Sequence, residues 1–206
     1  MFTLYYSPGS CAFASHIALE DAGAPYKLAP VDFKAGEQRS APYLAINPKA
    51  RVPALATDRG VVTENPAILA FIAQSFPQAK LAPLDDPFAF AELQAFNAYL
   101  CSTVHVAHAH RMRGPRWADE QSSYEDMRRR VAGNMAACFE LIEATMFRGP
   151  WAMGESYTVA DPYLFTLSSW LHGDGVDIAK FPRVADHGKR MAERESVKRA
   201  YEREYA

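Results

Sequence analysis

Cys11 stands where a loop gives way to a predicted helix, so its sulfur is placed for chemistry. The first N–H groups of a helix have no partner inside the helix, and together with the helix dipole they favour an anion beside them. Such a position lowers a thiol pKa from about 8.5 toward roughly 3.5 to 7.5, and the thiolate is the nucleophilic and redox-active form. We therefore expect a reactive thiolate at Cys11. The alternative at this position is a small, buried apolar residue.

The neighbours of Cys11 limit what its thiol can do. The residue three positions later is Ala14, so no Cys-x-x-Cys pair can close an internal disulfide. Any redox chemistry must therefore pair this one thiol with an external thiol. Ser10 and Tyr6 carry hydroxyl groups that can donate to a bound sulfur, although each is also an ordinary loop or strand residue.

Pro53 directly precedes a predicted strand at 54–57. A cis Val52-Pro53 bond would make a sharp turn and aim the Val52 N–H and C=O at the Cys11 loop, where an extended peptide can pair with them as a strand does. We predict the cis form. A trans proline at the start of an edge strand is the alternative, because only about 5–6% of X-Pro bonds are cis.

Glu64 and Asn65 open a predicted helix immediately after a strand. The helix start offers N–H groups to a ligand carboxylate, and the Glu64 carboxylate can pair with an ammonium group, so the pattern suits a zwitterion. The alternative is an acidic first turn that only complements the helix dipole.

The elements that must position these residues fall into two groups. Short strands alternate with helices over the first eighty or so residues, which is typical of an α/β layer, whereas the chain beyond a proline-rich stretch at 77–87 has only helical periodicity. We expect domains at 1–79 and 88–206 joined by a linker at 80–87. The expected strands are 2–6, 26–31, 54–57 and 61–62, and the expected helices begin near 11, 63, 88, 124, 158, 182 and 196.

Composition limits the partners and the compartment. The 206 residues carry a net charge of −2, so no overall field favours nucleic acid or an anionic membrane. The N-terminus lacks a secretory signal pattern, and no apolar run approaches the roughly 20 residues of a membrane span. We expect an intracellular protein with reduced thiols, because Cys11, Cys101 and Cys138 are odd in number and widely spaced.

His105 and His108 have the spacing of metal ligands on one helix, but no third ligand accompanies them. The sequence therefore predicts no metal. Cys101 and Cys138 lie on apolar helical stripes and are interpreted as core residues.

Four motifs in order resemble those of bacterial beta-class glutathione transferases, over nearly the whole chain. The resemblance implies a thioredoxin-like α/β N-terminal domain, an all-α helical-bundle C-terminal domain (the GST fold), glutathione as co-substrate without a metal, a homodimer and a cytoplasmic location. The motifs are Ser-Pro-Gly-Ser-Cys11-Ala-Phe-Ala-Ser-His16, Asn47-Pro48-Lys49-Ala50-Arg51-Val52-Pro53, Thr63-Glu64-Asn65-Pro66 and the capping-box segment Tyr157-Thr158-Val159-Ala160-Asp161.

The resemblance also assigns roles to residues. It implies that Cys11 contacts the glutathione sulfur, that Val52 pairs with the cysteinyl backbone, and that Glu64 and Asn65 hold the γ-glutamyl end. The expected glutathione-binding residues are Ser10, Cys11, Lys34, Arg51, Val52, Pro53, Glu64 and Asn65; the expected catalytic residues are Cys11 and His105; and the expected second-substrate pocket is Tyr6, His105, Met112 and Trp170.

The sequence departs from the family pattern on the first long helix of the second domain. Asn97 and His105 are one residue further apart than in the family, which implies that one of them is displaced. If His105 is in register, Ala98 takes the place of the asparagine and His105 faces the glutathione sulfur. The segment around Lys34 is also shortened, which leaves the register of this residue open.

These observations predict a glutathione transferase that conjugates glutathione to small apolar electrophiles, with thiol-disulfide exchange through Cys11 as a further activity. One alternative is another glutathione-dependent enzyme on the same scaffold, such as a thiol reductase, dehalogenase or isomerase. The other is a non-catalytic binding protein that kept the scaffold.

Overall fold

The computed structural model describes residues 1–205, and these begin with a four-stranded sheet of order β2-β1-β3-β4. Strand β1 pairs parallel with β2 and antiparallel with β3, which forms a hairpin with β4. The predicted strands are therefore confirmed, with small shifts at their ends. Their bounds are Phe2–Tyr6 for β1, Tyr26–Pro30 for β2, Ala54–Thr57 for β3 and Gly60–Thr63 for β4.

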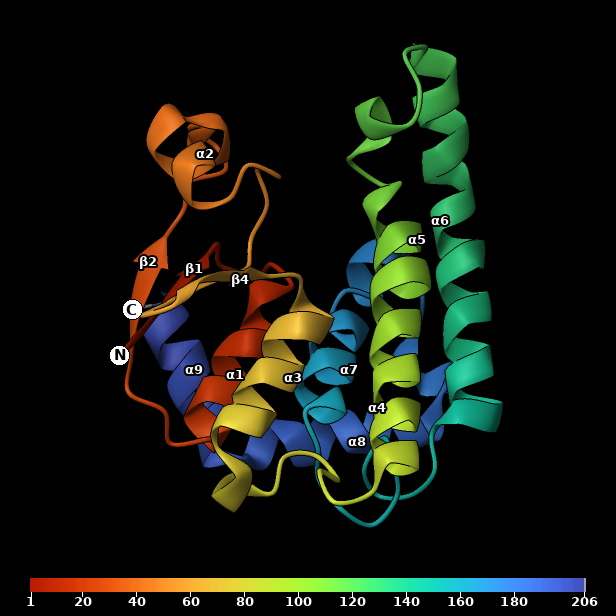
Figure 1. Ribbon diagram of the computed structural model, residues 1–206. Helices are drawn as coiled ribbons and strands as arrows, with labels where there is room; N and C mark the ends of the chain where they lie inside the picture. Colours follow the sequence, from red (N-terminus) through yellow and green to blue (C-terminus); the bar gives the residue numbers. More distant parts are fainter. Residues whose placement is uncertain (206) are drawn as a thin grey trace.

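Three helices accompany the sheet: α1 (Ala12–Asp21), α2 (Ala41–Ile46) and α3 (Asn65–Ser75). Figure 1 shows α1 and α3 side by side on one side of the sheet and α2 beyond the other. Sequence periodicity did not predict α2, because its six residues span fewer than two turns. The Ser40 hydroxyl marks its start by accepting the Tyr43 N–H at 3.4 Å.

Helix α1 is buried on nearly every side. Ala12, Ala14, Ile17 and Leu19 are all fully buried, and the helix packs against α3, α7 and α9. A helix that is apolar all round belongs inside a core and not at a surface. The start of α1, where Cys11 lies, is therefore held by both halves of the chain.

The second half of the chain is helical. In Figure 1 the helices α4 and α5 continue one another and stand beside α6, which fits the predicted bundle. The domain limits themselves stay a prediction. The helices are α4 (Pro87–Tyr99), a π-helical turn (Leu100–Val104), α5 (His105–Ala109), α6 (Gln121–Leu141), a second π turn (Ile142–Met146), α7 (Ala160–Ser168), α8 (Pro182–Glu193) and α9 (Glu195–Tyr205).

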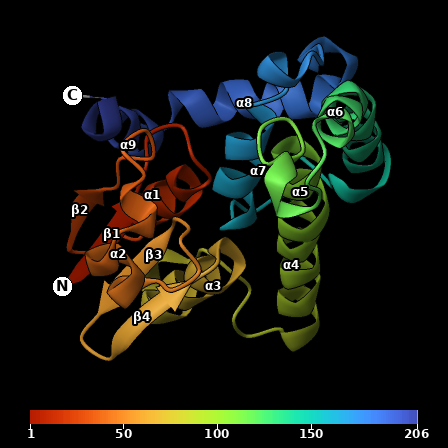
Figure 2. The same ribbon diagram turned by 90° about the horizontal axis from the view of Figure 1, so that it is seen from above.

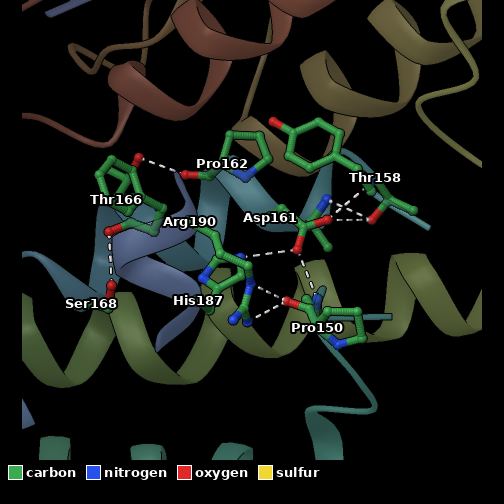
Figure 3. Close-up of polar contacts among 12 residues, drawn as sticks. Pro150, Thr158, Asp161, Pro162, Thr166, Ser168, His187 and Arg190 are labelled. Atoms are coloured by element: carbon green, nitrogen blue, oxygen red, sulfur yellow. Dashed lines mark hydrogen bonds and ion pairs between the residues drawn. The ribbon is translucent and has the colours of Figure 1, made fainter. Parts of the chain in front are cut away.

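The predicted capping box starts α7 (Figure 3). The Thr158 hydroxyl accepts the Ala160 N–H at 3.3 Å, and the Asp161 carboxylate accepts the Thr158 N–H at 2.7 Å. The other Asp161 oxygen accepts the Ala152 N–H at 2.7 Å and lies 3.0 Å from His187 Nε2. Both oxygens of the Asp161 carboxylate are therefore paired at this buried start, as in a capping box, whereas His187 Nδ1 has no partner within residues 1–205.

A search of residues 1–205 for a helix both long and apolar enough to cross a bilayer finds none.

Candidate active site

Cys11 lies at the junction of the β1–α1 loop and helix α1, as predicted, and its side chain is 8% exposed. The thiol does not turn toward the N–H groups of its own helix. It donates instead to the carbonyl oxygen of Val52, with 3.6 Å between sulfur and oxygen. The start of α1 and the segment before β3 therefore meet at this sulfur.

The peptide bond between Val52 and Pro53 is cis, so this prediction is confirmed. The preceding residue fixes the segment, because the Arg51 carbonyl accepts the Tyr43 hydroxyl at 2.7 Å and the Asn47 side-chain amide at 2.6 Å. Val52 is thus presented to Cys11 by a loop anchored on α2.

Asn65 binds the Cys11 loop from the other side. Its side-chain NH₂ donates to the Cys11 carbonyl at 2.7 Å, and its side-chain oxygen accepts the Ser15 hydroxyl at 2.6 Å. Because the side chain is 4% exposed and both its ends are occupied, it positions Cys11. The Asn65 side chain has no group left for glutathione. Only the Asn65 backbone N–H is still predicted to contact glutathione.

Glu64 precedes α3 in a backbone conformation that non-glycine residues rarely adopt, with φ 74° and ψ 125°. Such strain persists where the surrounding structure demands it and is concentrated at ligand sites. The Glu64 carboxylate is half-exposed and lies 2.8 Å from Lys49 Nζ, which also donates to the Thr63 hydroxyl at 2.8 Å. A half-exposed pair of this kind can open toward a charged ligand.

The electrostatics of Cys11 differ from the expectation. Burial, followed by the nearby Cys101 and Glu64, raises the pKa of the Cys11 thiol to about 12. The prediction of a lowered pKa is wrong, because within residues 1–205 the Cys11 side chain caps no N–H of α1 and is enclosed beside a carbonyl oxygen. Cys11 is therefore a hydrogen-bond donor at neutral pH.

Two residues of the helical half reach this sulfur. Burial, followed by the nearby Cys11 and Cys101, raises the pKa of the Tyr163 hydroxyl. Cys101 is only partly buried and lies on the π-helical turn. It packs against the core without being fully enclosed by it, so it lies at the edge of the core to which the sequence assigned it.

His105 lies near the same region, at the start of α5 and directly after the π turn that holds Cys101. Its ring lies edge-on to Trp170 at 5.2 Å, while His108 stacks on Trp170 at 4.2 Å and bonds Asp174 at 2.7 Å. Burial, followed by His108 and two arginines, lowers the pKa of His105 to about 4. The His105 imidazole is therefore neutral at pH 7.

The π turn accounts for the extra residue between Asn97 and His105. A π turn bonds i to i+5 and so absorbs one residue without rotating the helix that follows. Asn97 is fully buried and Ala98 is exposed, and which of the two takes the place of the family asparagine stays a prediction. Both amide atoms of Asn97 lack a hydrogen-bond partner within residues 1–205.

Known proteins share this arrangement. The family model "Glutathione S-transferase, N-terminal domain" matches residues 1–74. Glutathione S-transferase GstA of Escherichia coli O157:H7 is 30% identical over 200 residues, 96% of each chain. The chain belongs to the glutathione S-transferase family. A glutathione transferase homologue from Sulfitobacter, solved with bound glutathione, is 46% identical with a TM-score of 0.96 over 98% of both chains.

The predicted resemblance to bacterial beta-class transferases is also confirmed. The beta-class glutathione S-transferase of Sphingomonas chungbukensis is 30% identical to this transferase, with a TM-score of 0.86 over 98% of both chains. The predicted GST fold, a thioredoxin-like domain followed by a helical bundle, is confirmed by the same likeness.

Tyr6 of the transferase is buried at the end of strand β1. Its ring is 6% exposed and faces His16 at 6.3 Å, and burial, then Glu204, raises the pKa of its hydroxyl. The side chain therefore faces His16 and Glu204 of α9, and its place in the second-substrate pocket stays a prediction.

The remaining predicted residues lie near the cleft or at its rim. The Ser10 hydroxyl accepts the Ala12 N–H at 3.3 Å and so begins α1. Met112 is 60% exposed just beyond α5, and Lys34 is exposed in the β2–α2 loop. The ligand contacts of these three residues stay predictions.

Residues that the sequence did not single out complete the site. Lys49 belongs to the Asn47-Pro48-Lys49 motif, so its position next to Glu64 follows from the motif that places Val52. Ser15 belongs to the first motif in the same way. Arg116 lies in a connection without periodicity, and nothing in the sequence indicates its place.

Proposed function

We propose that this transferase binds glutathione in an extended form along Val52, with the glutathione sulfur against Cys11, and conjugates it to a small electrophile that lies against His105 and Trp170. The hydrogen bond from Cys11 to the Val52 carbonyl carries the proposal. It joins the thiol at the helix start to the one backbone segment that a cis proline makes available for strand-like pairing.

Binding of glutathione then exchanges one hydrogen bond for another. The cysteinyl N–H of glutathione takes the Val52 carbonyl that the Cys11 thiol now occupies. The released Cys11 thiol then donates a hydrogen bond to the glutathione sulfur. Because a hydrogen bond to a charged acceptor is stronger than one to a neutral carbonyl, the exchange favours the glutathione thiolate.

Cys11 acts in this proposal as a donor and not as a nucleophile. Its pKa of about 12 keeps the proton on Cys11 while glutathione loses its own proton to solvent. The glutathione thiolate attacks the electrophilic carbon, the new C–S bond forms, and the leaving group departs with its electron pair. Exchange through a Cys11 mixed disulfide is the lesser activity, because it requires the Cys11 thiolate.

His105 and Trp170 shape the second-substrate side. With a pKa of about 4, the His105 imidazole is neutral at pH 7. It can therefore form hydrogen bonds with the second substrate without adding a charge to the pocket. Trp170 offers an aromatic surface next to it, with ring centres 5.2 Å apart. A flat apolar electrophile fits against these two rings.

The test compares two reactions in three proteins: conjugation of 1-chloro-2,4-dinitrobenzene and reduction of a glutathione mixed disulfide, in wild type, Cys11→Ala and Cys138→Ala. We expect Cys11→Ala to lower kcat/KM for conjugation by about 10-fold to 100-fold, the value of one charged hydrogen bond. Cys138 is buried in α6 and is the matched control. Unchanged rates of both reactions in Cys11→Ala would remove Cys11 from the mechanism.

An arginine cluster supports a second candidate, an electrophile that carries a carboxylate. Partial burial, followed by Arg51, Arg113 and Arg39, lowers the pKa of Arg116, so these guanidinium groups lie close enough to repel one another. Arg113 also lies 5.8 Å from the Phe33 ring of the first half. Within residues 1–205 none of the four forms an ion pair, so the cluster is suited to an anion.

A matched pair of substrates distinguishes the two candidates. If the cluster selects an anion, 4-chloro-3-nitrobenzoate has a higher kcat/KM than its methyl ester after each value is divided by the uncatalysed rate constant. Arg116→Gln then removes this preference for the carboxylate. Arg130→Gln, an exposed change on α6, leaves it intact. A preference for the ester in wild type supports the apolar electrophile instead.

We also propose, from the family resemblance, a cytoplasmic homodimer with domains at 1–79 and 88–206 joined at 80–87. Light scattering of the purified chain measures the oligomeric state, and a monomer at micromolar concentration contradicts this part of the proposal.

A further inference from the structure

Asp174 is a buried carboxylate at the end of the short 3₁₀ helix (His172–Asp174) that follows α7, and its side chain is 0% exposed. Figure 2 shows α7 between α1 of the sheet half and α4 of the helical half, both of which it contacts. Burial of a carboxylate costs free energy unless partners compensate for it. The partners of Asp174 therefore indicate what this residue does.

Both carboxylate oxygens of Asp174 are paired with side chains from α5 and the turn after it. Oδ2 accepts a hydrogen bond from His108 Nδ1 at 2.7 Å, and Oδ1 accepts one from Arg111 Nη1 at 3.2 Å. Gly173 leaves room for the arginine, because a Cβ atom at this position would lie 2.7 Å from Arg111 Nη1. Since an ionised carboxylate only accepts, His108 Nδ1 carries the proton and the orientation of the ring is fixed.

His108 in turn packs against Trp170. The imidazole and indole rings are stacked, with 4.2 Å between their centres and 26° between their planes. The Asp174 N–H donates to the Trp170 carbonyl at 3.0 Å, and the indole N–H donates to the Gly9 carbonyl at 3.3 Å. The indole is thus held on its face by His108 and at its edge by Gly9. Rotation of the ring would break the stack or the hydrogen bond.

The orientation of Trp170 matters because this ring and His105 form the surface against which the second substrate is proposed to lie. The two ring centres are 5.2 Å apart, and Trp170 is partly exposed. A flat aromatic substrate can stack on this surface only while the indole keeps one orientation, and reaction rates depend steeply on how closely the reacting groups are held. Residues that hold the indole therefore affect the conjugation of aromatic substrates.

We propose that Asp174 is a positioning residue of the transferase, which acts through His108 to hold the Trp170 ring in the orientation that an aromatic second substrate requires. This inference rests on the proposed function and adds to it a residue that sets selectivity for aromatic electrophiles.

The test is a double-mutant cycle on the conjugation of 1-chloro-2,4-dinitrobenzene, with wild type, Asp174→Leu, His108→Ala and the double variant. Leucine has nearly the shape of aspartate but no acceptor. We expect Asp174→Leu to lower kcat/KM about 10-fold in wild type, but less than about twofold in His108→Ala, where Asp174 has no ring left to position. Independent losses that multiply in the double variant overturn the proposal. Asp85→Leu, at an exposed position before α4, is the control and should match wild type.

A second electrophile separates positioning from a merely structural role. Allyl isothiocyanate has no ring to stack on Trp170, so its conjugation should be unchanged in Asp174→Leu and in His108→Ala. Equal losses for both electrophiles overturn the proposal. Asp174→Asn keeps an acceptor oxygen for His108 and should recover part of the activity toward the aromatic electrophile.

A fluorescence measurement needs no catalysis, so it separates failure of this inference from failure of the proposed function. The chain has three tryptophans, and in a Trp117→Phe, Trp151→Phe background the emission comes from Trp170 alone. We expect acrylamide to quench this emission more strongly after Asp174→Leu, because the ring is no longer held. His108→Ala, at a partly exposed position, should have the same effect and keeps the test decisive if Asp174→Leu fails to fold. Unchanged quenching in both variants overturns the proposal, whatever the activity of wild type.

Discussion

Helices α7 and α1 both start inside the protein, but they start in opposite ways. At α7, the fully buried Asp161 accepts the N–H groups of Ala152 and Thr158 and contacts His187, all within 3.0 Å (Figure 3). At α1, Ser10 accepts one N–H at 3.3 Å, and the Cys11 thiol points elsewhere. Helix α3 begins at Glu64, whose side chain likewise caps no N–H within residues 1–205.

The difference separates scaffold from site. A helix start whose polar groups are all paired stabilises the fold and has nothing left to offer a ligand. The starts of α1 and α3 leave the Cys11 thiol and the Glu64 carboxylate without a role in capping their helices, and burial raises the pKa of the Cys11 thiol. Substitutions at the two kinds of start should therefore act on different quantities.

The largest effect is expected at the α7 start. Asp161→Ala leaves two buried N–H groups and the His187 imidazole without their acceptor, at about 1–3 kcal/mol each. The free energy of unfolding should fall by at least about 3 kcal/mol in urea denaturation. The control Asp186→Ala removes an exposed pair with Lys189 and should stay within about 0.5 kcal/mol. Equal losses in both variants would show that the capping box is not structural.

His105 should make stability depend on pH. Its folded pKa of about 4 lies below the ordinary 6.5, so the unfolded chain binds the proton more tightly. Neutral His105 therefore adds on the order of 2–3 kcal/mol to the free energy of unfolding above pH 6.5, and this stabilisation is lost as the pH falls toward 4. His105→Gln should flatten the stability profile over that range, whereas His172→Gln, at an exposed position, should not. Parallel profiles for wild type and His105→Gln contradict the account.

Cys11→Ala should separate activity from stability. The variant loses one long hydrogen bond and a small side chain, so the free energy of unfolding should change by only about 1 kcal/mol. The kcat/KM for conjugation should still fall by the 10-fold to 100-fold expected for the loss of one charged hydrogen bond. A loss of stability as large as that of Asp161→Ala would place Cys11 with the scaffold.

The smallest effect is expected at Glu64. Glu64→Gln removes the charge that can pair with the glutathione ammonium, and because the carboxylate is half-exposed the loss should be about 1 kcal/mol, or roughly fivefold in affinity. Calorimetric titration with glutathione measures it. Glu155→Gln, at an exposed position of the helical half, is the control, and an equal affinity in the two variants would exclude a Glu64 contact.

The same division describes what the sequence could predict. Local signals gave the helix start at Cys11, the cis bond before Pro53 and the capping box at Asp161, since each depends on neighbours in the chain. The sign of the Cys11 pKa shift could not be predicted, because it depends on burial and on Cys101, which only the fold brings to the sulfur.

Geometry within helices was also beyond the sequence. Helical periodicity assumes a regular turn, so the π turn at Leu100–Val104 was missed and the spacing of Asn97 and His105 was interpreted as a displacement of one of them. The burial of Tyr6 beside His16 and Glu204 likewise depends on the fold, because α9 is far from β1 along the chain.

A crystal structure of the transferase with glutathione tests the central claim most directly. We predict that the cysteinyl backbone of glutathione pairs with Val52 and that Cys11 Sγ leaves the Val52 carbonyl for the glutathione sulfur. Glutathione bound elsewhere, or a Cys11 thiol still bonded to Val52 with the tripeptide sulfur out of reach, would contradict the account.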